Sequence, residues 1–404
     1  MDRQGGSVDA QSVRSTPLRI LTLASLFPNA AQPNFGIFVE RQTAGLAARS
    51  GIDVTIINPI GMPPWPLRRA ARYAELAALP QHEQWRGLNV YRPRFTLIPK
   101  FGGPYNPALI TRAILPLVRR LHVQAPFDLI DAEFFYPDGP AAMRLAEALG
   151  IPFTIKARGS DIHHWSNAKG CASQILAAAD AAAGLLAVSG ALKTDMASLG
   201  MDAGKIMVHY TGLDQGRFAP RDRAAEKAKL GITGPMILCV GALIPRKNQA
   251  LLIEALTLLP DATLCLAGQG PSQSDFRKLA ENLGVANRLR FLGNVPHDDL
   301  PAMFAAADVM ALVSASEGLA NAWVEALACG TPVVASNVGG APELIRNPDA
   351  GRITETNVPA IVAAIGELIR NPIAPGRVAA TVAHFSWANN AERLDAFFQE
   401  IVTR

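Results

Sequence analysis

Two glutamates eight positions apart, Glu317 and Glu325, have the spacing that most clearly suggests chemistry. They lie in the segment Ser316–Cys329 (SEGLANAWVEALAC), after an apolar strand that ends near Val313 and around a helical pattern that begins near Asn321. The intervening turn would offer unpaired backbone N–H groups at the start of a helix. Both these amides and the helix dipole favour a negative group, and a diphosphate fits such a turn.

The residues of this turn suggest separate tasks. Gly318 would let the backbone approach a ligand closely. Glu317 lies in the turn, where its carboxylate could bond sugar hydroxyls, whereas Glu325 lies one helical turn further on and could accept hydrogen bonds from both ribose hydroxyls. Together these features suit a nucleotide diphosphate sugar, the donor of a sugar group. We expect the donor-binding residues of this segment to be Glu317, Gly318, Leu319, Ala320, Asn321 and Glu325.

The elements that must position these residues form two series of alternating strands and helices, as in parallel sheets covered on both faces. The strands predicted in the first half are Leu18–Ser25, Asp53–Ile60, Val90–Phe95, Phe127–Ala132, Pro152–Ala157, Leu185–Ser189 and Ile206–Tyr210. Those predicted in the second half are Met236–Gly241, Ala262–Ala267, Leu289–Leu292, Val309–Val313 and Pro332–Ser336. The sequence thus predicts an α/β protein with two Rossmann-like, doubly wound domains that face each other across a cleft.

The glutamate pair is followed by further glycine-containing segments, and together these motifs resemble glycosyltransferase family 4. They are E-x7-E from Glu317 to Glu325, the trailing Gly330–Ala335 (GTPVVA) and Gly339–Glu343 (GGAPE). The resemblance extends from Leu18 to the end of the chain and includes Ser25–Gly45, Ile151–Ile162, Val208–Pro220 and Ile237–Leu256. It implies a retaining glycosyltransferase of the GT-B fold, similar to bacterial transferases that build surface polysaccharides of the teichuronic or colanic acid type.

The order of these elements also predicts a domain organisation, whose domains the resemblance identifies as acceptor and donor domains. Residues 1–17 would be a flexible N-terminus, 18–212 an acceptor domain and 213–384 a nucleotide-sugar domain. Residues 385–404 would form a C-terminal helix that packs back onto the first domain. The boundary falls in Gly212–Gly234, which is rich in charges and contains Pro220.

Further donor-binding positions follow from the resemblance, residue by residue. Lys247 matches the family's diphosphate-binding lysine, Gly36 its first glycine loop and Val295 a residue beside the base. The arginine usual after the family's strand is replaced here by Ala242, and Arg246 could supply the missing charge.

The sequence departs from the family again near the expected reaction centre. Many members have His-Gly-x-Asp there, whereas this chain has Arg158-Gly159-Ser160-Asp161. We expect the catalytic residues to be Glu317, Arg158 and Asp161. Because an arginine stays charged, it could stabilise developing phosphate charge or position the acceptor. A simple pairing of Arg158 with Asp161 is the alternative, and the following His163 and His164 are expected to be solvated.

The expected reaction uses no metal and no other cofactor. The chain has no Asp-x-Asp triplet, which commonly holds a divalent ion on the donor diphosphate, so Arg246 and Lys247 would neutralise it instead. The resemblance implies that the configuration at the anomeric carbon of the sugar is retained. Since no nucleophile of the kind that retaining hydrolases use is apparent, a same-face displacement is favoured.

Composition and charge limit the kinds of partner that the protein is expected to have. The chain has 404 residues, a net charge of +4 and 49% apolar residues, which suit a globular protein and give no argument for nucleic-acid binding. Between Gly61 and Arg120 the only acids are Glu75 and Glu83, against ten basic residues: Arg68, Arg69, Arg72, Arg86, Arg92, Arg94, Lys100, Arg112, Arg119 and Arg120. This stretch could face an anionic membrane or a lipid-phosphate acceptor, and an ordinary solvated surface is the alternative.

The remaining predictions concern compartment and partners. No signal-peptide pattern or membrane-spanning run appears, so the protein is expected to be cytoplasmic, at most peripheral at the inner face of the plasma membrane. The expected partners are a nucleotide-sugar donor and a saccharide or polyprenyl-linked acceptor. The four cysteines are expected to be buried free thiols.

Three other functions are alternatives. A dinucleotide enzyme would use Gly268-Gln269-Gly270, but the third glycine of that fingerprint is replaced by Gln273. A nucleotide-sugar epimerase would act on the donor without an acceptor. A non-catalytic nucleotide-sugar-binding protein is the third alternative, because Ala242 and Arg158 depart from the family pattern.

Overall fold

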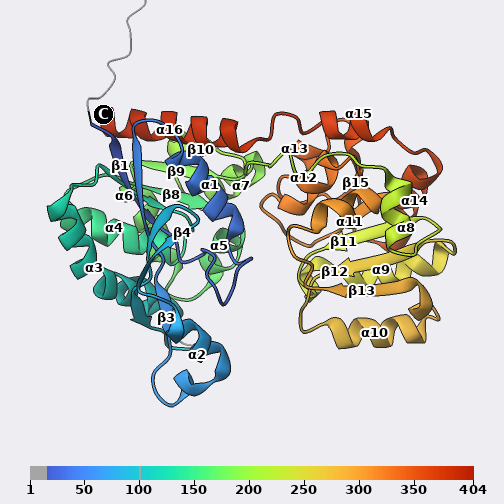
Figure 1. Ribbon diagram of the computed structural model, residues 1–404, viewed down its shortest axis with the longest axis horizontal. Coiled ribbons are helices and arrows are strands. Elements are labelled where there is room, and N and C mark those ends of the chain that lie inside the picture. The colour runs from blue at the N-terminus through green and yellow to red at the C-terminus, as the bar shows by residue number, and fades with distance from the viewer. Residues whose placement is uncertain (1–15, 100–101) are drawn as a thin grey trace, which may run out of the picture.

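The computed structural model describes residues 16–99 and 102–404, which form two lobes connected through a linker and a C-terminal helix (Figure 1). Almost all of the predicted flexible segment 1–17 lies outside the described residues, as does Lys100. Each lobe is built on a twisted sheet with helices on both faces, so the predicted α/β architecture of two doubly wound units is confirmed.

The first lobe contains an eight-stranded sheet in which all neighbours are parallel except β4 and β5. In spatial order its strands are β10 (Ile206–Val208), β9 (Gly184–Ala187), β8 (Phe153–Ala157), β7 (Leu129–Ala132), β1 (Leu18–Leu23), β2 (Ile52–Ile57), β5 (Leu88–Tyr91) and β4 (His82–Trp85). The central strands are buried almost throughout, which accounts for their unbroken apolar runs.

Helices cover both faces of this sheet. On one face lie α3 (Asn106–Gln124), α4 (Asp138–Leu149) and α6 (Ala172–Ala181). On the other face α1 (Ile37–Ala47) packs against the C-terminal helix α16 (Trp387–Thr403). Two further helices, α5 (Ser160–His163) and α7 (Gly190–Ser198), follow β8 and β9 and lie toward the second lobe.

The predicted single strand Val90–Phe95 is wrong, because two strands occupy this stretch. The first, β5, belongs to the large sheet, whereas β6 (Arg94–Thr96) pairs in parallel with β3 (Ile60–Met62) in a separate small sheet. Between them Pro93 has no N–H to continue the ladder, although its carbonyl accepts from the amide of Ile60. The connection between β3 and β4 carries α2 (Ala71–Ala78) and projects from the lobe as an arm (Figure 1).

The second lobe contains a six-stranded sheet of parallel strands. In spatial order they are β13 (Leu289–Gly293), β12 (Thr263–Ala267), β11 (Met236–Val240), β14 (Val309–Leu312), β15 (Val333–Ser336) and β16 (Gly351–Thr354). Its helices are α8 (Arg223–Lys229), α9 (Gln249–Ala255), α10 (Gln273–Asn282), α11 (Leu300–Ala306), α12 (Asn321–Ala328), α13 (Ala341–Leu344), α14 (Val358–Arg370) and α15 (Pro375–Ala380). The sequence prediction missed the edge strand β16, which is short and contains a charged residue, Arg352.

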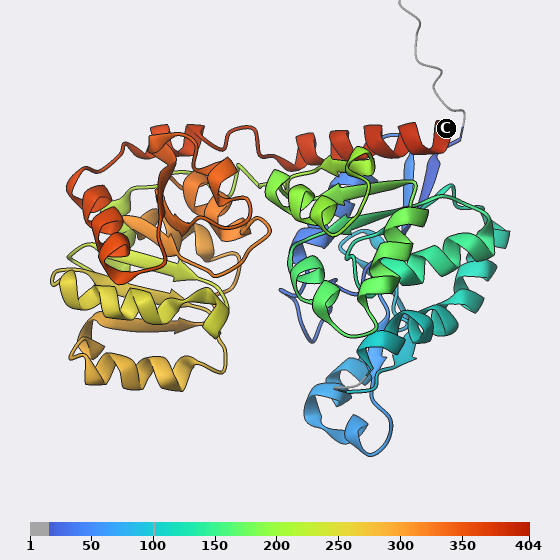
Figure 2. The same cartoon turned by 180° about the vertical axis from the view of Figure 1, so that it is seen from behind.

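The C-terminal helix α16 returns from the second lobe and lies along the first (Figure 2). Its residues Leu394, Phe398 and Ile401 are buried in the same apolar cluster as Ile20 of β1 and Val39 of α1. This amphipathic packing fixes the end of the chain to the lobe in which the chain begins. The four cysteines are free and buried, as predicted: Cys171, Cys239, Cys265 and Cys329.

Candidate active site

The turn Glu317-Gly318 between β14 and α12 is enclosed by glycines from two other segments of the chain. A Cβ placed on Gly159 would lie 2.8 Å from the nitrogen of Gly318, and one on Gly339 would lie 2.1 Å from the carbonyl oxygen of Glu317. The amide of Gly340 donates to the carbonyl of Gly318 at 2.6 Å. Since even a methyl group would collide here, Gly159 permits the approach of the two lobes, and Gly339 permits the approach of the neighbouring loop within the second lobe.

The first lobe also contacts this turn through β9 and α7. The hydroxyl of Ser189 donates to the carbonyl of Gly318 at 3.2 Å. Nearby, the carboxylate of Glu343 in α13 accepts from the amides of Gly190 and Ala191 at 2.9 and 2.7 Å and from the Tyr210 hydroxyl at 2.9 Å. Glu343 thus caps a helix of the opposite lobe, a contact that the sequence analysis did not predict.

Helix α12 begins at the predicted anion-binding position. Its N-cap residue, Ala320, has no side chain that could bond the first amides, and Asn321 opens the helix. Leu319 is buried beneath the turn. An uncapped helix start in a cleft leaves its N–H groups and partial positive charge available to a ligand.

The two predicted cations lie beside this helix start, in the 3-10 helix Pro245–Lys247. The amine of Lys247 forms an ion pair with Oε1 of Glu317, and Nη1 of Arg246 lies 3.8 Å from Oε2 of the same carboxylate. The Arg246 guanidinium also donates to the carbonyl of Ser316. The structure therefore brings Arg246, Lys247, Glu317 and Gly318 together, as the sequence predicted.

Glu325 is linked to the first lobe through a residue that the sequence analysis missed, His297. Nε2 of His297 lies 2.8 Å from Oε1 of Glu325, and Nδ1 lies 3.2 Å from a guanidinium nitrogen of Arg41 in α1. A neutral ring that donates through Nε2 and accepts through Nδ1 satisfies both contacts. The ring of Phe218 packs edge-on against His297, with centroids 5.2 Å apart.

A cavity of about 360 Å³ opens at the carboxyl ends of β11, β12 and β13. Val295 and His297 line it on one side, while Asn34 and Ile37, which flank the predicted Gly36, line it on the other. Gly36 has a left-handed backbone (φ 73°), and a Cβ there would lie 2.5 Å from the carbonyl oxygen of Leu26. The cavity also includes Ala242, where a small side chain leaves space.

A second cavity, of about 450 Å³, has the Glu317-Gly318 turn in its wall. The residues that line it come from both lobes: Arg158, Ser160, His163, His164, Arg246, Ser316, Glu317 and Gly318. His163 is not simply solvated as expected, because its Nε2 lies 2.9 Å from Oδ2 of Asp195. This cavity contains the predicted catalytic residues Glu317 and Arg158.

Arg158 does not pair with Asp161 through its side chain, so that alternative is wrong. Its Nε donates to the carbonyl of Glu133 at 2.8 Å, and its Nη2 forms an ion pair with the Glu133 carboxylate. The guanidinium carbon lies 4.7 Å from the ring centroid of Phe38. The sequence analysis missed Glu133, which lies 25 positions from its partner.

Asp161, the third predicted catalytic residue, is buried and does not line the cavity. Its carboxylate accepts from the amides of Phe135, Arg158 and Gly159 at 2.8 to 3.1 Å. Burial raises the pKa of Asp161, although these amide bonds oppose the shift. The contacts give Asp161 the task of shaping the loop that presents Arg158, and they leave it no direct contact with the cavity.

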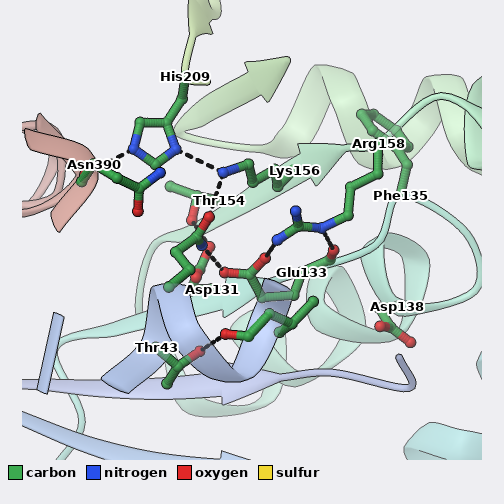
Figure 3. Close-up of polar contacts among 12 residues, drawn as sticks. Thr43, Asp131, Glu133, Phe135, Asp138, Thr154, Lys156, Arg158, His209 and Asn390 are labelled. Carbon is green, nitrogen blue, oxygen red and sulfur yellow. Dashed lines mark hydrogen bonds and ion pairs between the residues drawn. The ribbon is translucent and has the colours of Figure 1, made fainter. Parts of the chain in front are cut away.

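A buried polar network supports Arg158 from behind (Figure 3). The carboxylate of Glu133 also accepts from Gln42, which in turn accepts from the amine of Lys156. Lys156 contacts Nδ1 of His209 at 2.6 Å, and Nε2 of His209 lies 2.9 Å from the carbonyl of Asn390 in α16. Burial lowers the pKa of Lys156 to about 7 and the pKa of His209 well below its usual value.

Comparison with known families divides the chain at the same place as the structure. Residues 36–217 match the family described as Glycosyltransferase Family 4, and residues 222–383 match Glycosyl transferases group 1. The two matches correspond to the first and second lobes.

Known relatives agree with these matches. The chain is 28% identical over 402 residues to the "Putative teichuronic acid biosynthesis glycosyltransferase TuaC" of Bacillus subtilis (strain 168), covering 95% of this chain and 99% of that protein. It is 40% identical over 177 residues to a GDP-mannose-dependent alpha-(1-6)-phosphatidylinositol monomannoside mannosyltransferase of Mycolicibacterium smegmatis, which covers 40% of this chain and 46% of that protein.

Solved structures share the fold at lower identity. Sucrose-phosphate synthase from Thermosynechococcus elongatus superposes with a TM-score of 0.73 at 20% identity, covering 95% of this chain and 96% of that one. Anabaena Alr3699/HepE in complex with UDP and glucose gives a TM-score of 0.71 at 22% identity, covering 95% and 100%. With its two matched domains and its GT-B architecture, the chain belongs to the family 4 glycosyltransferases.

Proposed function

We propose that this glycosyltransferase binds a nucleotide diphosphate sugar across the Glu317-Gly318 turn and transfers the sugar to an acceptor in the cavity beside Arg158. The observation that carries this proposal is the meeting of two cations with an uncapped helix start. Lys247 and Arg246 face the turn at the beginning of α12, and the carboxylate of Glu317 occupies the position between them. A diphosphate bound at the start of α12, beside this carboxylate, would accept hydrogen bonds from the helix amides and lie near both cations.

The remaining parts of a nucleotide sugar would occupy the two cavities described above. The nucleoside would lie in the cavity lined by Val295, Asn34 and Ile37, and Glu325, which contacts the lining residue His297, would face the ribose. The sugar would extend into the cavity lined by Glu317 and Arg158. UDP and glucose are bound by the structurally similar Alr3699/HepE, which supports the same class of donor here.

The transfer that we propose retains the configuration at the anomeric carbon. The bond from this carbon to the leaving phosphate oxygen breaks, the bond to the acceptor oxygen forms on the same face, and the acceptor's proton passes to the leaving phosphate oxygen. Lys247, Arg246 and the α12 amides would stabilise the negative charge that develops on the diphosphate. An NMR assignment of the product anomer tests this, and an inverted linkage would exclude it.

We further propose that the reaction is independent of a divalent metal. Within the described parts of the chain, no group of three or more His, Cys, Asp or Glu side chains is arranged to hold an ion. The charge of the diphosphate would instead be met by Arg246 and Lys247. Activity that is lost in EDTA and restored by Mg²⁺ or Mn²⁺ would contradict the proposal.

For the acceptor we propose a saccharide on a lipid carrier, in the synthesis of a bacterial surface polysaccharide. The relative of Bacillus subtilis, named for teichuronic acid biosynthesis, supports this pathway class because it matches along nearly the whole chain. The relative of Mycolicibacterium smegmatis, which matches over 177 residues, is named as a phosphatidylinositol monomannoside mannosyltransferase.

The projecting arm supports a peripheral contact with an anionic membrane. Trp65 is 68% exposed and Leu67 54% exposed, and the guanidinium of Arg69 lies 5.7 Å from the Trp65 ring centroid. Arg68 is exposed beside them. Such a combination of aromatic, aliphatic and basic side chains is suited to the boundary between lipid headgroups and acyl chains. No described helix is long and apolar enough to cross a bilayer.

Two measurements test the proposed function. In the first, thermal unfolding is followed with a panel of nucleoside diphosphates and their sugars, because a cognate donor stabilises the folded state by mass action. In the second, sugar transfer is measured with the donor alone and with lipid extracts. Conversion of the donor without an acceptor would favour an epimerase, and the absence of stabilisation by every nucleotide would refute donor binding.

Cosedimentation with vesicles tests the membrane contact. Wild type should sediment with vesicles that contain phosphatidylglycerol and less with neutral phosphatidylcholine vesicles, since part of the attraction is electrostatic. The substitution Trp65→Ala together with Leu67→Ala should release the protein without changing its thermal stability. Equal sedimentation of the wild type and this variant would contradict a contact through the arm.

A further inference from the structure

The cavity beside Glu317 has a charge pattern that narrows the class of substrate. We propose that it recognises an anionic group, a carboxylate or a phosphate, carried by the transferred sugar or by the acceptor close to the reacting atoms. The inference rests on the proposed function, since it assumes that sugar transfer takes place in this cavity. It goes further by stating the charge of the substrate there.

The first argument is the rigid presentation of Arg158. Two nitrogens of its guanidinium are held by Glu133, one through the carbonyl and one through the carboxylate, and the Phe38 ring lies 4.7 Å from the guanidinium carbon. The Arg158 side chain is only 6% exposed, so it cannot swing into solvent. Its remaining nitrogen, Nη1, has no hydrogen-bond partner among residues 16–99 and 102–404. The guanidinium is therefore clamped on one edge and free on the other.

The second argument is the charge balance of the cavity wall. Two permanent positive charges, Arg158 and Arg246, line it from opposite lobes, against the single carboxylate of Glu317. Immediately behind the wall the negative charge of Glu133 and the positive charge of Lys247 offset each other. One positive charge is left over in the free protein, and once Arg246 and Lys247 hold the donor diphosphate, the free edge of Arg158 remains for a further anion.

A neutral sugar would not match such a wall. Closing a cleft over the free Nη1 edge of Arg158 carries a desolvation cost, because the water that would solvate this donor is excluded. A carboxylate or phosphate would accept a charge-assisted hydrogen bond from the free edge of Arg158, and the planar guanidinium suits these groups better than an ammonium does. Arg246 could approach the same group from the second lobe, so that binding would also favour closure.

Two sources of the anion fit the same chemistry: an acidic sugar in the donor, or a phosphate or uronate in the acceptor. They are separated by two binding experiments on the full-length protein. In the donor arm, UDP-glucose is compared with UDP-glucuronic acid, or GDP-mannose with GDP-mannuronic acid if GDP is the stabilising nucleotide. In the acceptor arm, the protein saturated with the nucleoside diphosphate is titrated with glucose, glucuronate, glucose 6-phosphate and inorganic phosphate.

The expected result is a preference of about ten-fold or more in Kd for the anionic probe in one of the two arms. The double variant Glu133→Gln/Arg158→Gln removes both charges of the ion pair, so that neither charge is left buried without its partner. It should lose the preference for the anionic probe. The variant Arg246→Gln, at the more exposed wall, should weaken it independently. The variant Arg377→Gln, whose ion pair with Asp349 lies outside the cavity, is the matched control and should keep the preference.

The inference is overturned if neutral and anionic probes bind equally in both arms, or if the preference survives in the Glu133→Gln/Arg158→Gln and Arg246→Gln variants. These outcomes differ from a failure of the proposed function. Stabilisation by a nucleoside diphosphate without any preference for an anion counts against the inference alone. A lack of stabilisation by every nucleotide counts against the donor site itself.

Discussion

Gly159 of the first lobe and Gly318 of the second are in backbone contact, and neither has room for a side chain. A Cβ on Gly318 would lie 2.7 Å from the carbonyl oxygen of Arg158, just as one on Gly159 would lie 2.8 Å from the Gly318 nitrogen. The contact joins the loop that presents Arg158 to the turn that carries Glu317. Closure of the cleft and assembly of the proposed catalytic residues are therefore the same event.

The substitution Gly318→Ala should reduce sugar transfer by about a hundred-fold, because the added methyl group forces the two loops apart and misplaces the reacting groups. Transfer rates check the effect, and small-angle scattering checks whether the lobes separate. Gly376→Ala is the control, because a Cβ at that position meets nothing within 4 Å. Full activity of the Gly318→Ala protein would show that this contact is not needed for transfer.

The substitution Glu317→Gln should lower the rate of transfer by about a hundred-fold or more while the protein remains folded. The amide keeps the size of the side chain but loses the charge that pairs with Lys247 and faces the transferred sugar. Steady-state kinetics and a thermal unfolding curve give both quantities. Glu400→Gln, on the exposed surface of α16, should behave as wild type. If Glu317→Gln and wild type had equal rates, a non-catalytic role of this carboxylate would follow.

The substitution His297→Ala should weaken binding of the nucleoside diphosphate by about ten-fold, because Glu325 would lose the donor that orients its carboxylate. His297→Gln, which can still donate to Glu325, should recover part of the affinity. Titration calorimetry measures both Kd values, with the exposed His82→Ala as control. An unchanged Kd in His297→Ala would mean that Glu325 needs no support from this ring.

Asp138 should make the folded protein less stable as the pH rises from about 4 to about 7. Burial raises the pKa of its carboxyl from the ordinary 3.8 to about 7, helped by the charges of Asp161 and Glu133 and opposed by the amide of Ser25. Between these two pKa values the folded state holds a proton that the unfolded state has released. The stabilisation is therefore complete below about pH 4 and is lost as the pH rises through about 7.

The matched variant is Asp138→Asn, which cannot titrate. Urea unfolding at about pH 5 and about pH 8 should show the free energy of unfolding of the wild type falling relative to that of the variant. A difference between the two proteins that stays constant over this range would contradict the raised pKa.

The parts of the site that could be predicted from the sequence consist of residues that are neighbours along the chain. Glu317 and Gly318 lie in one turn, Arg246 and Lys247 in another, and the glycine at 339 marks the close approach that the structure contains. These positions depend on local geometry, namely the end of a strand, a tight turn and the start of a helix. Such patterns are visible without knowing the tertiary arrangement.

The supporting residues could not be predicted, because their partners lie far away in the sequence. Arg158 contacts Glu133 across 25 positions, His297 contacts Arg41 across 256, and Glu343 reaches Gly190 across 153. No local pattern distinguishes such a glutamate or histidine from a solvated one. For the same reason the residue type of Asp161 predicts a catalytic residue. Its observed contacts are instead with backbone amides of its own loop and of a neighbouring one.

The return of α16 to the first lobe means that the chain passes between the lobes twice, and this limits how they can move. The two passages lie side by side: Nδ2 of Asn390 donates to the carbonyl of Tyr210 at 2.7 Å, and the Trp387 ring covers Gly212 so closely that a Cβ there would lie 2.4 Å from it. A single tether would let one lobe swing and twist freely. Two adjacent connections should restrict opening of the cleft to rotation about a single axis. Each closure would then bring Gly159 and Gly318 back to the same contact.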